Sequence, residues 1–207
     1  MGWAELDEMG DIIVHATKPL EDPTVRYVID AKASTFFVQA FATGLLASFG
    51  HDPKIAIRDF QGDVNFNLTG LTIEGAHLNL SIQASSLEVV DDISEKDRQE
   101  IHRKMCDEVL ETDRFPEIRY ECSRVSASGS GDRFWVALNG ELSLRGVTKA
   151  QPVSARVVIN GSSVRATGEF SIRQSDYEIT PVSAAAGAIK IKDEVKCTFD
   201  IVARKQE

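Results

Sequence analysis

The sequence predicts a mainly β protein, folded as an antiparallel barrel or sandwich of about eight to ten strands. Short segments in which apolar and polar residues alternate recur along most of the chain. Hairpin signals such as Asn160-Gly161 separate these segments, and only residues 94–120 show helical periodicity. A closed barrel is favoured over a sandwich because closure removes exposed strand edges.

Composition indicates a globular protein large enough to bury a core. The chain has 207 residues, of which 43% are hydrophobic and 27% charged. Its net charge of −9 disfavours nonspecific binding to nucleic acid or to anionic membranes, so we expect no nucleic-acid partner. No run approaches the roughly 18 apolar residues of a membrane span, so we expect no stable membrane insertion.

The cysteines and the first residues bear on the cellular compartment. Cys106, Cys122 and Cys197 are an odd number without metal-site or redox-motif spacing, which predicts free, packed thiols. No basic start followed by a long apolar run marks a secretory signal, so a cytoplasmic location is expected. Residues 1–24 are predicted to be a flexible lead-in, and residues 25–207 to form the domain.

The first strands are predicted over residues 26–30 and 34–42. Residues 43–57, which are punctuated by glycine and proline, are expected to form a short helix or a wide turn. In the second strand three apolar side chains share one face: Phe36, Val38 and Ala40.

The next strands are predicted over residues 55–68, with a turn near Gln61-Gly62, and over residues 77–84 after a reversal at Thr69-Gly70. The strand over residues 77–84 has the clearest alternation. Leu78, Leu80 and Ile82 lie on one of its faces and polar residues on the other.

The helix is predicted to begin at Ser94, whose hydroxyl is suited to cap the first turn. Ile101, Met105 and Val109 recur at i+4 spacing and form a docking face. The opposite face is charged, with opposite charges paired at i+4 spacing. This pattern predicts a structural lid or strut for a barrel, ended near Pro116.

The second half continues the alternation. Strands over residues 118–125 and 133–145 are expected to be joined by a loop at 126–131, with Gly140 as a bend or bulge. Strands over 152–159 and 163–173 follow, and the last strand is predicted over residues 189–204. Between them, Thr180 before Pro181 is placed to cap a brief helical turn.

Several segments together resemble the YceI-like family of lipocalin-like barrels, whose members are associated with binding polyisoprenoids. The resemblance spans roughly residues 26–203. It rests on residues 27–30, the strand at Gly62, residues 96–98 with 115–118, residues 140–148, and residues 193–195. Ala33-Ser34 stands where the family often carries His-Ser, and His51-Asp52 resembles the Gly-His-Asp of a cytoplasmic-type branch.

The resemblance implies an eight-stranded extended barrel that holds one amphiphilic chain, an isoprenoid quinone or a polyprenyl lipid, for transport, storage or sequestration. It implies no other cofactor and no metal, and it suggests a homodimer. A diphosphate head group would need a cluster of cations such as Arg58, Arg173, Lys190 or Lys192, whereas a quinone would not. The residues expected to line the cavity are Phe36, Val38, Ala40, His51, Leu78, Leu80, Ile82, Phe134, Val136, Leu138, Phe170 and Phe199.

His51 with Asp52 is open to three interpretations: a structural turn, a polar contact to a ligand, or part of a catalytic or metal site. No third ligand and no complete catalytic constellation is visible in the sequence, so we expect a protein that is not an enzyme. The alternative functions are a stress-response interaction protein without a stable ligand, or a weak hydrolase that uses His51.

Overall fold

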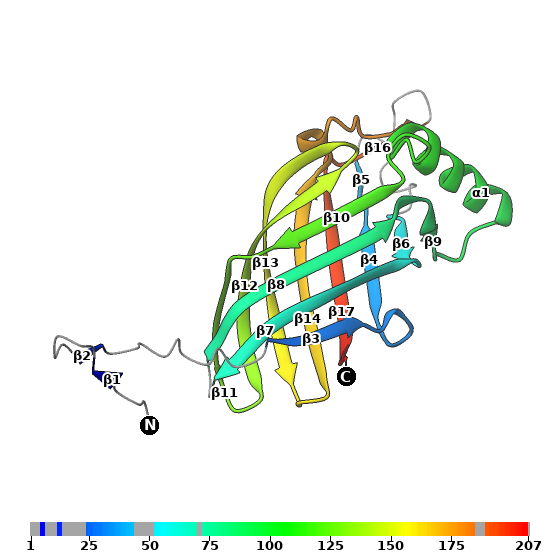
Figure 1. Cartoon of the computed structure of the whole chain (residues 1–207). Coiled ribbons are helices and arrows are strands. Elements are labelled where there is room, and N and C mark those ends of the chain that lie inside the picture. The colour runs from blue at the N-terminus through cyan, green and yellow to red at the C-terminus, as the bar shows by residue number, and fades with distance from the viewer. Residues whose placement is uncertain are drawn as a thin grey trace.

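The computed structural model describes residues 5–6, 12–13, 24–43, 52–69, 72–184 and 189–206. Its main feature is a closed antiparallel barrel with a helix at one end (Figure 1). This confirms the predicted eight-stranded, lipocalin-like barrel. Two short strands precede the barrel in the sequence and pair with each other: β1 (Glu5–Leu6) and β2 (Ile12–Ile13).

The barrel is an up-and-down meander in which four of the eight positions each hold two consecutive strands. These pairs are β3 (Val25–Ile29) with β4 (Thr35–Gln39), β6 (Lys54–Ile57) with β7 (Phe60–Thr69), β8 (Thr72–Gln83) with β9 (Leu87–Val89), and β10 (Glu117–Cys122) with β11 (Val125–Ser130). The other positions are β12 (Arg133–Leu144), β13 (Val147–Ile159), β14 (Ser163–Arg173) and β17 (Glu194–Lys205). A small separate sheet contains β5 (Ala42–Thr43), β15 (Ser183–Ala184) and β16 (Ile189–Ile191).

The barrel closes along β17, which pairs with β14 on one side and with β3 and β4 on the other. Strand alternation then sorts the side chains between the inside and the outside. In β12, Phe134, Val136 and Leu142 are buried, whereas Trp135 is 59% exposed. The strand therefore alternates between the inside and the outside of the barrel, as its apolar and polar pattern predicts.

The sheet bends sharply at Arg58-Asp59 and at residues 84–86, which lie opposite each other. The Arg58 amide donates to the Ser86 carbonyl over 3.2 Å, and the Gln83 amide donates to the Asp59 carbonyl over 3.0 Å. The turn predicted at Gln61-Gly62 is therefore wrong, because both residues lie inside β7. Glycine is needed at position 62 because a Cβ there would collide with the Asn79 carbonyl oxygen.

Three other local predictions are corrected. Residues 126–131 are not a long loop, because β11 pairs with β12 up to Ser130, leaving a tight turn with Gly131 at φ +64°. Gly140 is not itself a bulged residue, since the register of β12 with β13 runs through it unbroken; the extra residue lies opposite it, between β10 and β11, where the register with β12 shifts by one. Thr180 caps no helix, because β15 begins at Ser183, and the helical turn in this region comes earlier, over Gln174–Tyr177.

The predicted helix is confirmed as α1 (Glu95–Lys104), which continues into a π-helical turn, Met105–Val109. The Ser94 hydroxyl accepts the Asp97 amide over 3.1 Å, as the sequence predicted. The cysteines are free as predicted, with Cys122 and Cys197 buried and Cys106 partly buried.

Helix α1 lies along the free edge of β9, which pairs with β6 alone among the described strands. Arg98 donates to the Val89 carbonyl and, over 3.0 Å, to the Asp91 carbonyl. The His102 Nδ1 atom lies 3.1 Å from the Leu87 carbonyl oxygen. Side chains of the helix thus satisfy backbone acceptors that a neighbouring strand would otherwise satisfy.

Two ion pairs fasten the strands where the barrel closes. Arg165 binds Asp200 through both carboxylate oxygens, at 2.8 and 2.5 Å, and Arg204 binds Asp30 at 2.7 Å. The hydrogen bond from each arginine holds the pKa of its aspartate partner below the ordinary value.

These lowered pKa values predict acid sensitivity. Because the folded carboxylates bind protons less readily than the unfolded ones, their stabilisation is complete above the unfolded pKa of about 4 and is lost as pH falls through the lower folded pKa. The urea midpoint is expected to fall in that range, and Asp200→Asn should flatten the dependence. A variant whose midpoint retains the full wild-type pH slope would contradict this assignment.

Candidate ligand-binding cavity

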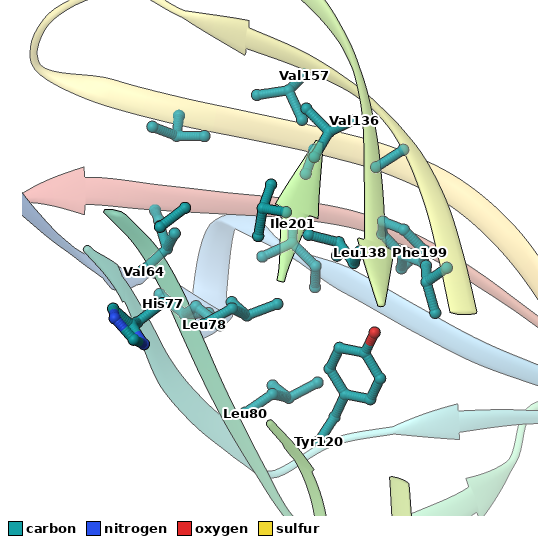
Figure 2. Close-up of a pocket in the computed structure, with 18 of the residues that line it drawn as sticks. Val64, His77, Leu78, Leu80, Tyr120, Val136, Leu138, Val157, Phe199 and Ile201 are labelled. Atoms are coloured by element: carbon teal, nitrogen blue, oxygen red, sulfur yellow. The ribbon is translucent and has the colours of Figure 1, made fainter. Parts of the chain in front are cut away.

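The barrel interior contains two adjoining apolar cavities. The first, of about 170 Å³, lies among β7, β8, β12, β13, β14 and β17, and we call it the narrow chamber (Figure 2). The second, of about 480 Å³, lies beneath α1 and is called the wide chamber. The side chains of Val64, Leu78 and Val136 point into the narrow chamber in Figure 2.

The two chambers meet at a ring of shared lining residues, which we call the waist: Phe36, Ile82, Leu142 and Phe170. The Phe36 ring lies at its centre, with ring centroids 6.5 Å from Phe60, 6.5 Å from Phe170 and 6.2 Å from Phe199. The edge-on geometry of these rings is favourable for aromatic pairs. The interior thus holds two adjoining apolar chambers, with aromatic rings at the waist between them.

Tyr120 brings a hydroxyl group into the narrow chamber (Figure 2). That hydroxyl donates to the Gln151 carbonyl over 3.0 Å, and burial raises the pKa of Tyr120 to about 12. The ring reaches this carbonyl by crossing Gly140, where a Cβ would lie 2.6 Å from the ring. The Tyr120 hydroxyl is therefore neutral and already hydrogen-bonded. Glycine is needed at position 140 because any side chain there would collide with the Tyr120 ring.

The helical passage closes the wide chamber. Ile101, Met105 and Val109 line it, together with Leu110. Met105 and Leu110 are buried, and the charged face of α1 lies outside, where Arg103 and Lys104 pair with Glu100. This arrangement matches the lid predicted from the i+4 spacing.

One arginine ties together three segments at this lid. Glu111, Arg145 and Glu178 are the non-glycine residues with left-handed backbones in the described chain, at φ 48°, 51° and 58°. Arg145 pairs with the Glu111 carboxylate and donates to the Glu178 carbonyl. The sequence neighbours of the three residues line the wide chamber: Leu110, Leu144 and Ile179.

Strained backbone of this kind persists only where surrounding contacts hold it. The Arg145 contacts therefore fix the end of the helical passage, the β12–β13 turn and the turn after Gln174–Tyr177 against one another. We call this group the Arg145 latch.

Most of the residues predicted to line a cavity do so in the structure. Val38 and Ala40 line the wide chamber; Phe36, Ile82 and Phe170 line both; Leu78, Leu80, Val136, Leu138 and Phe199 line the narrow one. Phe134 lines neither and is buried in the core beside Gly129. His51 lies outside the described residues. That the lining residues contact a ligand stays a prediction.

Other lining residues were not predicted. Val153, Ala155 and Val157 of β13 line the narrow chamber, and their alternation in the sequence was a usable signal. Gln174 lines the wide chamber, but it stands in a polar run after a strand, and nothing in the sequence distinguishes it from a surface residue.

The cation cluster considered for a diphosphate head group does not form at the wide chamber, where Lys190 is the one member of that set among the lining residues. Arg58 pairs with Glu88 at 2.7 Å, and the Lys192 ammonium lies 5.8 Å from the centre of the Phe41 ring. Arg173 lines a separate polar pocket beside Asp176.

Across the described ranges, no group of three or more His, Cys, Asp or Glu side chains is arranged to hold a metal ion. None of the helices in the described part of the chain has the length and apolar character needed to cross a membrane.

Comparison with known families agrees with this architecture. The model of the YceI-like domain matches residues 27–203. The chain belongs to the YceI-like family. It is 26% identical over 144 residues to a UPF0312 protein of Shewanella baltica strain OS155, covering 69% of this chain and 68% of the relative. A UPF0312 protein of Shewanella denitrificans is 28% identical over 135 residues, or 65% and 63% of the two chains.

Two solved structures share the fold of this chain. BcnA of Burkholderia cenocepacia has a TM-score of 0.63 at 16% identity, covering 84% of this chain and 98% of BcnA. A polyisoprenoid binding domain from Saccharophagus degradans has a TM-score of 0.62 at 16% identity, covering 87% and 98%. At these identities the likeness shows a shared fold.

Proposed function

We propose that this YceI-like protein binds one isoprenoid chain lengthwise through both chambers and shields it from water for transport, storage or sequestration. The observation that carries the proposal is the pair of adjoining apolar chambers, which share the four waist residues. The structural neighbour from Saccharophagus degradans, described as a polyisoprenoid binding domain, supports it by analogy of fold.

The dimensions suit an amphiphilic chain. The wide chamber alone, at about 480 Å³, falls within the usual range of small-molecule pockets. Each buried methylene contributes about 0.8 kcal/mol, so a chain that fills both chambers gains ample binding free energy. A narrow, flexible chain is also the shape that passes a waist of aromatic rings.

Native mass spectrometry after gentle purification tests the proposal. The wild-type protein is expected to carry a mass that organic solvent removes, and the emptied protein should take up added geranylgeraniol. The proposal is wrong if the purified wild-type protein carries no bound mass and does not take up added geranylgeraniol.

A pair of variants locates the site. Ala155→Leu adds bulk inside the narrow chamber, whereas Ser154→Leu adds the same kind of side chain to the outer face of β13. The first variant is expected to retain shorter chains or less ligand, because overfilling costs about 1–3 kcal/mol. The second should retain the wild-type pattern. Equal retention by both variants would place the ligand elsewhere.

A further inference from the structure

Polar groups are distributed unequally between the two chambers. In the narrow chamber the Tyr120 hydroxyl is already bonded, and the other polar residues of the lining, His77 and Arg119, are exposed residues. The wide chamber has four polar lining residues: Lys104, Gln174, Ser183 and Lys190. Of these, Gln174 is buried, with only 8% of its surface exposed.

The hydrogen bonds of Gln174 fix the orientation of its amide. Its Nε2 atom lies 2.9 Å from the Lys192 carbonyl oxygen and 3.4 Å from that of Asp193. Because carbonyl oxygens only accept hydrogen bonds, the NH₂ group must face them. The Oε1 atom therefore points away from these two carbonyl oxygens.

Within the described part of the chain, that oxygen has no hydrogen-bond donor. No described residue donates a hydrogen bond to Gln174 Oε1, and it is not among the fully enclosed, unbonded polar atoms of the described chain, which are Asn67 Oδ1 and Arg145 Nε. The atom therefore contacts open space. Gln174 lines the wide chamber and is otherwise buried, so we infer that this space is the chamber.

We propose that Gln174 Oε1 accepts a hydrogen bond from a hydroxyl group on the ligand, so that the preferred ligand is an isoprenoid alcohol or phenol. Its head lies in the wide chamber under α1, and its tail passes the waist into the narrow chamber. This inference rests on the proposed function and names the chemical class of its ligand.

Other head groups fit this chamber less well. A quinone offers only acceptors, so its carbonyls leave the Gln174 oxygen unbonded, and a buried acceptor without a partner weakens binding. A diphosphate places negative charge beside that oxygen. Of the two lysines that line the chamber, Lys104 lies 3.5 Å from Glu100 and is partly neutralised, which leaves Lys190 as the main counter-charge. A hydroxyl group supplies the donor that the site lacks.

The test compares two probes that differ only in the donor: geranylgeraniol and its methyl ether. Competition between them on the emptied full-length protein, followed by native mass spectrometry, should show about a tenfold preference for the alcohol, the usual effect of one net hydrogen bond. In Gln174→Met, which keeps the side-chain length, the preference should fall to about one, while affinity for the ether stays unchanged.

Gln39→Met is the matched control. The Gln39 amide also donates to two backbone carbonyls, of Asp52 at 2.6 Å and Ala40 at 3.3 Å, but Gln39 lines neither chamber. It should keep the tenfold preference. Similar thermal midpoints for the two variants would separate the effect on the ligand from a loss of structure.

The outcomes are distinct. Equal binding of alcohol and ether by the wild type overturns this inference, even if Gln174→Met fails to fold, and leaves the proposed function standing. Loss of both ligands to the same extent in folded Gln174→Met also overturns it, because Gln174 would then act only on the structure. Failure of the wild type to bind either probe counts instead against the proposed function.

Discussion

Replacing Phe36 with alanine is expected to lower the free energy of unfolding by about 3–5 kcal/mol, the usual range for a buried phenylalanine. The ring is 7% exposed and stands at the waist against Phe60, Phe170 and Phe199. Its loss removes three aromatic contacts and leaves a cavity at the waist. Urea unfolding monitored by circular dichroism measures the change.

Phe37→Ala is the control, because Phe37 is the next residue on the same strand and points to the other face. Its ring is covered by the Lys54 ammonium at 4.1 Å, an exposed contact worth about 1 kcal/mol or less. In the Phe36→Ala variant, loss of the ring should also open the waist, so that the two chambers become one cavity. Equal losses of stability in the two variants would show that the waist is not packed as described.

Replacing Arg145 with methionine is expected to cost about 2–3 kcal/mol, below the range for breaking a fully buried pair. The Arg145 and Glu111 side chains are 21% and 19% exposed, and Arg145 also donates to Glu178. Without the Arg145 side chain, the other two left-handed residues, Glu111 and Glu178, lose their common partner. Hydrogen exchange is expected to quicken around Glu111 and Glu178, and a bound isoprenoid should dissociate faster.

Arg114→Met gives a strict comparison, since Arg114 pairs with the same Glu111 carboxylate but is 71% exposed. Exposed pairs contribute about 0–1 kcal/mol, so this variant should behave nearly as the wild type does. If both variants loosen the lid equally, the effect belongs to the charge on Glu111 and not to the Arg145 latch.

Much of the barrel was predictable because its inner and outer faces differ in polarity. The alternation at Leu78, Leu80 and Ile82 placed these side chains inside, where they line the chambers. The Ser94 cap and the docking face of the helix were predictable for the same reason, since capping and amphipathicity are local signals.

The predictions failed where the structural role of a residue depends on a neighbour that is distant in the sequence. Gly62 and Gly140 resemble turn or bulge residues in sequence, but both lie inside strands, because the Asn79 carbonyl and the Tyr120 ring leave no room for a Cβ. Residues 126–130 are small and polar and resemble a loop, yet pairing with β12 makes them a strand. Gln174 was missed because only the tertiary fold turns its amide toward the Lys192 carbonyl.

The contact between α1 and β9 links ligand exchange to the risk of aggregation. Arg98 and His102 satisfy the carbonyls along the outer edge of β9, and the same helical passage roofs the wide chamber. Any movement that lifts the helix to admit a chain therefore also bares a strand edge that can pair with a second molecule. In the structure, Arg98 and His102 keep this edge covered.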